Sequence, residues 1–215
     1  MDIFSYIMGR NAASKEGGGG SGEYEYNAIY ATTVATYAFY GDTKLTAVNL
    51  PKVLSVEEKA FGACENLKSV SLPLATTIGK YAFTNTNNLK TIDLPSLATV
   101  GDSVFDGCKG IETLVLPGAT TIGAQVFVGC SNLAKLDLPV AKSIGRMCFM
   151  NCSNLTAIIL RNTNEVCSIV TTMAFTADRY YYIPATMWSA YEEKYTSQIS
   201  YFRKIEDYPE ICEVA

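Results

Sequence analysis

Apolar and polar positions along the chain repeat with a period of 22 residues. Each repeat begins with an aliphatic residue, and these first residues are Leu45, Leu67, Leu89, Ile111, Leu133 and Leu155. The shared pattern is L-x-x-[IV]-x-L-P-x-x-x-[TS]-[IV]-G-x-x-[AV]-F-x-x-C-x-N. A fixed period in this range is typical of a solenoid, because one such coil cannot bury its own apolar face and must be covered by the next coil.

One repeat, LKSVSLPLATTIGKYAFTNTNN, shows the elements expected in every coil. Alternating apolar and polar residues predict a short strand over 67–72 with one face buried. Pro73 ends this strand, because proline has no N–H to continue a ladder. A second short extended segment follows with Ile78 buried, and residues 80–83 are expected to form a helical turn that buries Phe83. The pattern therefore predicts an α/β repeat solenoid of 22-residue coils with short parallel strands and helical turns.

The repeated residues are expected to form the core and to carry no chemistry. Six of the nine phenylalanines occupy one column, namely Phe39, Phe61, Phe83, Phe105, Phe127 and Phe149. Five of the seven prolines occupy another, namely Pro51, Pro73, Pro95, Pro117 and Pro139.

Departures from the pattern divide the chain into four parts. Residues 1–16 are expected to be an N-terminal docking peptide, 17–22 a Gly/Ser linker, 23–176 the solenoid, and 177–215 a C-terminal helical cap. The first and last coils are irregular, as a solenoid requires, since an uncapped coil exposes its core and its strand edge.

The N-terminal peptide is nearly continuous in apolar residues and is followed by a run of glycines, which behaves as flexible coil. We expect it to dock in a groove of a virion or other large assembly protein through Ile3, Phe4, Tyr6, Ile7 and Met8. Two alternatives remain open: the peptide folds back over the first coil, or the glycines are a cloning linker.

Composition excludes several classes of function. The net charge of −4 and the scattered basic residues argue against a nucleic-acid partner. No run of 18 apolar residues occurs, so we expect no membrane insertion. The first ten residues lack the features of a signal peptide, so we expect no export by a signal of the chain's own. Without export, and with an odd number of cysteines, we expect all seven cysteines to be reduced.

Candidate chemistry is sparse, and we expect neither enzymatic activity nor a cofactor. The chain contains no histidine, which removes the commonest general base and metal ligand. One column holds Cys64, Cys108, Cys130 and Cys152. Stacked thiolates could bind a soft metal ion, but Thr86 occupies the same column, which favours a small buried packing position.

The outward positions of the predicted strands form rows of small polar residues. This face is suited either to contact with a protein or glycan or merely to solubility. Its candidate ligand residues are Ser69, Ser71, Thr91, Asp93, Thr113, Lys135 and Asp137.

The leucine columns, the "IG" step and the "AF-x-x-C-x-N-L" ending resemble the BspA-like leucine-rich repeats of bacteria, over about Tyr24 to Tyr208. The resemblance implies protein or glycan binding without catalysis, in cell-surface adhesion proteins or in bacterial and phage proteins. The arrangement of peptide, linker and solenoid also resembles accessory virion proteins of tailed phages.

Together these features predict a non-enzymatic protein of a phage virion, acting as an accessory or host-adhesion protein anchored by its N-terminal peptide. The alternatives are a bacterial surface adhesin of the BspA-like type and an intracellular protein-interaction scaffold in the cytoplasm.

Overall fold

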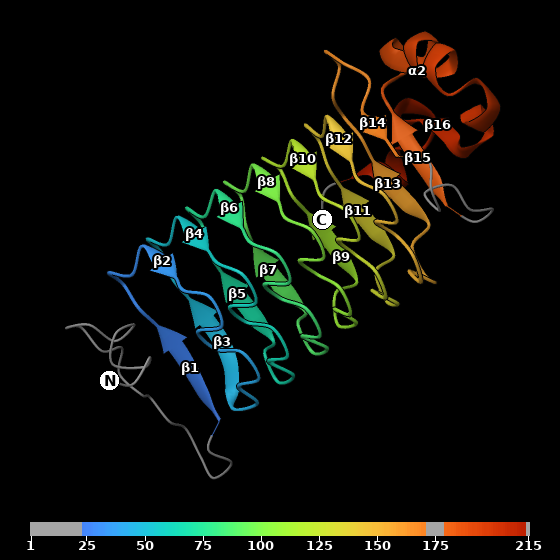
Figure 1. Ribbon diagram of the computed structural model, residues 1–215. Helices are drawn as coiled ribbons and strands as arrows, with labels where there is room; N and C mark the ends of the chain where they lie inside the picture. Colours follow the sequence, from blue (N-terminus) through green and yellow to red (C-terminus); the bar gives the residue numbers. More distant parts are fainter. Residues whose placement is uncertain (1–22, 171–178, 214–215) are drawn as a thin grey trace.

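The computed structural model describes residues 23–170 and 179–213. Within these ranges the chain forms a solenoid in which successive coils stack side by side from β1 to β15, with a helical segment at the C-terminal end (Figure 1). The predicted docking peptide (1–16), the linker (17–22) and the end of the predicted solenoid (171–176) lie outside the described residues.

Each coil contributes two short strands, as the sequence predicts. The first strands of the coils, with β15 after them, are β1 (Tyr24–Asn27), β3 (Leu45–Asn49), β5 (Ser69–Ser71), β7 (Thr91–Asp93), β9 (Thr113–Val115), β11 (Lys135–Asp137), β13 (Ala157–Ile159) and β15 (Tyr180–Ile183). The second strands are β2 (Thr33–Val34), β4 (Ser55–Val56), β6 (Thr77–Ile78), β8 (Thr99–Val100), β10 (Thr121–Ile122), β12 (Ser143–Ile144) and β14 (Ser168–Ile169).

All strand pairs are parallel, and most join a residue to the one 22 positions later. Val70, for example, pairs with Ile92, and Ile78 pairs with Val100. The second strands form one continuous seven-stranded sheet, whereas the first strands form two sheets, β1-β3-β5-β7 and β9-β11-β13-β15-β16. The predicted repeat solenoid is therefore confirmed, with an interruption between β7 and β9 that the repeat does not predict.

The phenylalanine column forms a continuous stack through the core. Neighbouring rings from Phe39 to Phe149 lie 5.2–6.0 Å apart with interplanar angles of 7–11°. The rings of Phe61, Phe83 and Phe105 are completely buried. Each ring is thus covered by the rings of the coils before and after it, which is why no coil is stable alone.

The segment around each phenylalanine differs from the expected helical turn. Tyr81 and Asn85, two residues before and after Phe83, both have a left-handed backbone with φ of 57°, and the same alternation recurs in the other coils. This conformation prevents a regular helix. The Phe83 N–H instead donates to the Val104 carbonyl of the next coil (3.0 Å), and the Thr84 N–H donates to Tyr81 within its own coil (3.1 Å). The segments therefore form a third ladder between coils.

The cysteine column is buried and also donates hydrogen bonds. The thiol of Cys108 lies 3.0 Å from the carbonyl oxygen of Phe83, and the thiol of Cys130 lies 3.0 Å from that of Phe105. Thr86 donates its hydroxyl proton to Phe83 at 2.7 Å. Burial raises the pKa of the Cys108 thiol to about 12, so these side chains act as neutral donors in the core.

A C-terminal cap follows β15. It contains η1 (Ala185–Met187), α2 (Trp188–Lys194), η2 (Thr196–Tyr201), β16 (Phe202–Lys204), η3 (Ile205–Asp207) and α3 (Pro209–Cys212). The hydroxyl of Tyr191 accepts the Cys167 N–H (2.9 Å), and the hydroxyl of Tyr195 accepts the Ile169 N–H (2.6 Å). Two tyrosines thus satisfy backbone donors at the last strand of the seven-stranded sheet, which would otherwise be an open edge.

Arg179 closes the phenylalanine column at the same end. Its guanidinium lies 5.4 Å from the ring centroid of Phe149 and donates to the carbonyl oxygens of Phe149 (3.1 Å) and Cys152 (3.3 Å). The arginine therefore covers the last ring of the stack and satisfies carbonyl groups that a further coil would otherwise bind.

We expect Phe105→Ala to lower the free energy of unfolding by about 3–5 kcal/mol, because it removes a ring from the middle of the stack and leaves a cavity. Thr99→Ala, at an exposed position of the same coil, should change it by less than about 0.5 kcal/mol. Urea titration followed by circular dichroism measures both values. A loss below about 1 kcal/mol for Phe105→Ala would contradict the role of the column.

The buried thiols should react slowly in the native protein. With the pKa of Cys108 raised to about 12 against the ordinary 9.0, its thiolate population at pH 8 falls about a thousandfold. We expect alkylation of Cys108 and Cys130, followed by mass spectrometry of their peptides, to be at least about a hundredfold slower in the native protein than in guanidinium chloride. Equal rates in the two states would show that the column is open to solvent.

Candidate functional site

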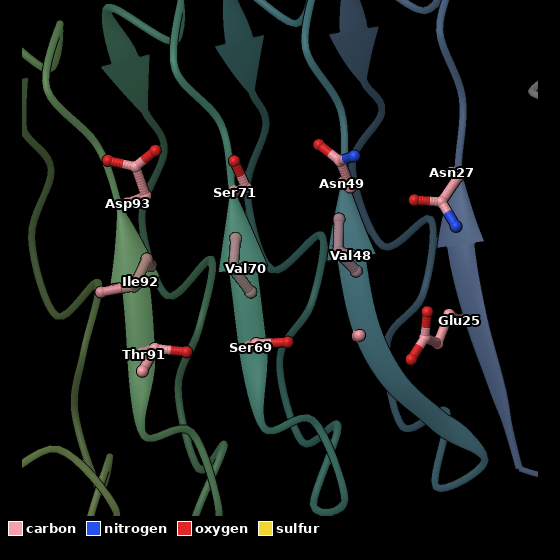
Figure 2. Close-up of a pocket in the computed structure, with 11 residues that line it drawn as sticks. Glu25, Asn27, Val48, Asn49, Ser69, Val70, Ser71, Thr91, Ile92 and Asp93 are labelled. Carbon is pink, nitrogen blue, oxygen red and sulfur yellow. The ribbon is translucent and has the colours of Figure 1, made fainter.

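The outward side chains of the first strands and β15 form one surface, here called the strand face. On β1, β3, β5 and β7 they lie in two parallel rows, one containing Glu25, Ser69 and Thr91 and the other Asn27, Asn49, Ser71 and Asp93 (Figure 2). The rows follow directly from the parallel register, since every outward position stacks on its counterpart in the next coil.

These two rows line a shallow depression of about 470 Å³, here called the open groove. The residues between the rows, Val48, Val70 and Ile92, form its floor, and the side chains of Val48 and Val70 are buried in the core behind it. Within the described residues, the side chains of Glu25, Asn49 and Asp93 make no hydrogen bond or ion pair. The open groove therefore presents carboxylate, amide and hydroxyl groups whose hydrogen-bonding capacity is available to a partner.

The other half of the strand face is covered by the chain's own C-terminal segment. Side chains of β13 and β15 pack with residues of that segment in a small apolar cluster of Ala157, Ile159, Tyr180, Tyr182, Ile205, Tyr208 and Ile211. At the edge of this cover, the ammonium group of Lys135 donates to the backbone carbonyl of Glu213.

Asp137 lies at an outward position of β11 but is buried, with 1% of its surface exposed. The guanidinium of Arg161 pairs with its carboxylate through two nitrogens, with Nη2 at 2.8 Å and Nε at 3.2 Å from Oδ2. Arg161 stands where the repeat has proline, so the departure from the pattern supplies the cation that a buried carboxylate needs.

The seven predicted ligand residues therefore separate into two groups. Ser69, Ser71, Thr91 and Asp93 lie together in the open groove, and Thr113 follows on β9, where it is exposed. Lys135 and Asp137 are engaged by the C-terminal segment and by Arg161. The apolar outward residues Ala157 and Ile159 are a sequence signal that these positions are buried, but they do not indicate which segment covers them.

A second exposed group lies at the start of the solenoid, in the phenylalanine segments. Lys59 donates to the hydroxyl of Tyr37 (3.1 Å), which raises the pKa of the ammonium group, and its nitrogen lies over the rings of Tyr37 (5.2 Å) and Tyr81 (5.6 Å). About half of the surface of Tyr37 and of Tyr40 is exposed. Tyr37 and Tyr40 therefore provide exposed surface for contact, whereas Tyr191 and Tyr195 of the C-terminal cap are buried.

No group of three histidine, cysteine, aspartate or glutamate side chains in residues 23–170 and 179–213 could hold a metal ion. No helix there is both long enough and apolar enough to cross a membrane. The predicted docking residues Ile3, Phe4, Tyr6, Ile7 and Met8 lie outside the described part of the chain.

The repeats match the BspA-type leucine-rich repeat region, in six copies that span residues 32–156 and 76–178. The match covers more than half of the chain, which therefore belongs to the BspA-type leucine-rich repeat family. Proteins built from this repeat are generally non-catalytic binding proteins. No curated protein matches the chain.

Solved bacterial structures resemble this solenoid. The leucine-rich repeat protein TpLRR of T. pallidum is 28% identical with a TM-score of 0.50, and the match covers 64% of this chain and 63% of that protein. A leucine-rich cell surface protein of Faecalibacterium prausnitzii is 26% identical with a TM-score of 0.51, over 66% of this chain and 36% of that protein. This chain thus matches less than two thirds of the length of either.

The pneumococcal vaccine antigen PcpA shares the fold at 19% identity, with a TM-score of 0.54 over 84% of this chain and 39% of that protein. The structural relatives are therefore bacterial leucine-rich repeat proteins, among them a cell-surface protein and an antigen.

Arg161→Met should lower the free energy of unfolding by about 3–5 kcal/mol, because it leaves the buried carboxylate of Asp137 without its cation. The double variant Asp137→Asn, Arg161→Met removes the charge as well and should recover at least half of that loss. Urea titration at pH 7 measures both. If the single variant loses less than about 1 kcal/mol, the ion pair is not a structural element of the covered half.

Proposed function

We propose that this chain is a non-catalytic binding protein that acts at a bacterial surface and holds a protein of a host cell on the open groove. The observation that carries the proposal is the division of the strand face. One half is closed by the chain's own C-terminal segment, whereas the other half leaves polar side chains in ordered rows with no partner among the described residues.

A stacked solenoid suits this role physically. The positions of the outward side chains are set by backbone ladders and by a buried ring stack, so little conformational freedom is lost when a partner binds. The rows combine carboxylate, amide and hydroxyl groups over four strands, which offers a partner both charge and hydrogen-bond complementarity.

The location at a bacterial surface is supported by the similarity to the F. prausnitzii cell surface protein. The N-terminal docking peptide is compatible with the same role, since residues 1–16 and the glycine linker would attach the solenoid to a larger assembly. Attachment to a virion remains the other form of this hypothesis, supported by the apolar run Ile3–Met8 in the sequence.

The groove can be tested with the fluorescently labelled full chain and cultured epithelial cells, in flow cytometry. We expect saturable binding that trypsin treatment of the cells abolishes and glycosidase treatment leaves intact. Ser71→Trp places an indole in the groove and should weaken binding at least about tenfold, because the partner can no longer reach the floor. Thr99→Trp, on the other sheet, should bind as the unmodified chain does.

Deletion of residues 1–16 separates the two parts of the hypothesis. The truncated chain should bind cells normally and lose only its attachment to the parent cell or particle. If Ser71→Trp and Thr99→Trp bind equally well, or if only the deletion abolishes cell binding, the groove is not the binding site.

A further inference from the structure

The ladder of the strand face is interrupted between β7 and β9. The Leu72 N–H donates to the carbonyl of Asp93 in the next coil (3.0 Å), and the Leu116 N–H makes the equivalent bond (3.0 Å). Leu94, which lies between them in the same column, makes no such bond to Val115. A backbone donor at the strand face is therefore unpaired at this step within the described residues.

A second bond is missing on the other side of the same strands. The Lys90 N–H donates to Lys68 (2.9 Å) and the Ala134 N–H donates to Glu112 (2.8 Å), but the Glu112 N–H does not reach the Lys90 carbonyl. β7 and β9 are thus unpaired and form the facing edges of two different sheets.

The separation is confined to the strand face. Behind it, β8 and β10 are paired, and the Phe105 N–H donates to Val126 at 3.0 Å. The rings of Phe105 and Phe127 remain stacked at 5.7 Å. Two of the three hydrogen-bond ladders are therefore intact between these coils and one is broken, so the distance between the coils increases toward the strand face.

A departure from the repeat coincides with the break. Gly110 stands in the column that holds Asn66 and Asn88, and the side chain of Asn88 donates to the Glu65 carbonyl of the preceding coil (2.8 Å). Gly110 cannot make this bond. A Cβ at Gly110 would lie 2.5 Å from the Leu89 carbonyl oxygen, so the observed path of the chain excludes any side chain there.

The break opens a cavity of about 360 Å³, which adjoins the open groove through Thr91, Ile92 and Asp93. Its lining also includes Lys90 and Leu94, the residue whose N–H is unpaired. Within the described residues, the carboxylate of Asp93 and the ammonium group of Lys90 have no partner. Neither cavity is lined by an aromatic ring, the surface on which a sugar would stack.

The strand face already holds a polypeptide elsewhere. On the covered half, Lys135 binds the main-chain carbonyl of Glu213, and Tyr208 packs against Tyr182 with ring centroids 5.6 Å apart. The occupant there is a segment of this chain that crosses the face. The open half offers the same kind of surface with mostly hydroxyl and amide side chains and the carboxylates of Glu25 and Asp93.

We propose that the break between β7 and β9 anchors an extended peptide segment of the partner that carries a basic residue. Its main chain binds the backbone groups of Leu94, Glu112 and Lys90 that the ladder leaves unpaired, and its cation pairs with Asp93. This mode of recognition supplies affinity through main-chain hydrogen bonds and specificity through the charged pair. The inference rests on the proposed function, since it names the part of the partner that the groove receives.

Amide hydrogen exchange of the full chain, measured by nuclear magnetic resonance, tests the anchor directly. The probe is the acetylated and amidated peptide Thr-Val-Lys-Val-Thr. In the free protein we expect the Leu94 N–H to exchange at least about tenfold faster than its column neighbours Leu72 and Leu116, which are hydrogen-bonded. Saturating peptide should slow Leu94 at least about tenfold and leave those neighbours unchanged.

Titration of the same amide signals gives the affinity of the charged contact. Asp93→Asn should lower the affinity for the lysine peptide at least about fivefold, to the affinity of the unmodified chain for the peptide Thr-Val-Gln-Val-Thr. It should leave the affinity for this glutamine peptide unchanged. Glu58→Gln, at an exposed carboxylate of a phenylalanine segment, is the matched control and should change neither.

The inference is overturned if the Leu94 N–H exchanges as slowly as the Leu72 N–H in the free protein, or if the peptide slows the exchange of these two amides equally. It is also overturned if Asp93→Asn and Glu58→Gln have the same affinity for the lysine peptide. These outcomes differ from failure of the proposed function. If Ser71→Trp loses cell binding but the peptide neither protects the Leu94 N–H nor depends on Asp93, only the anchor hypothesis is wrong. If Ser71→Trp binds cells normally, the groove is not the binding site and the proposed function fails.

Discussion

The whole structure depends on the hydrogen bonds that join each coil to the next in register. They run in three ladders, along the first strands, along the second strands and along the phenylalanine segments, and each links a residue to one about 22 positions away. Because identical columns are superimposed, one apolar residue per column produces a continuous core, and one polar residue per column produces a continuous row. The Phe83 and Phe105 rings stack for the same reason that Ser71 and Asp93 align.

In a stacked solenoid, core residues without cover and backbone groups without a partner occur at the ends and where the sequence departs from the repeat. At the C-terminal end, Arg179 covers the last ring, and the hydroxyls of Tyr191 and Tyr195 satisfy the last strand. Inside the solenoid, Gly110 interrupts an asparagine column where one ladder opens, while the other two ladders keep the coils together. A fold with three parallel sets of bonds can tolerate the loss of one locally, which leaves a cavity on the face where the side-chain rows are free.

The sequence by itself determined the repeating coil. The period predicted the strand positions, the proline stops, the buried phenylalanine and cysteine columns and the outward rows, because all of these follow from contacts between neighbouring copies of one short pattern. It predicted a helical turn where the structure has alternating left-handed residues. That choice depends on hydrogen bonds to the next coil, as in the bond from Phe83 to Val104, and not on local propensity.

Only the tertiary structure decided which part of the strand face is open. The covering of β13 and β15 by Ile205, Tyr208 and Ile211 joins segments dozens of residues apart that share no period, so no repeat pattern encodes it. The same holds for the pairing of Asp137 with Arg161, which converts a predicted surface carboxylate into a buried one. The sequence therefore determined the rows of the candidate site, and the folded ends of the chain determined how much of those rows a partner can reach.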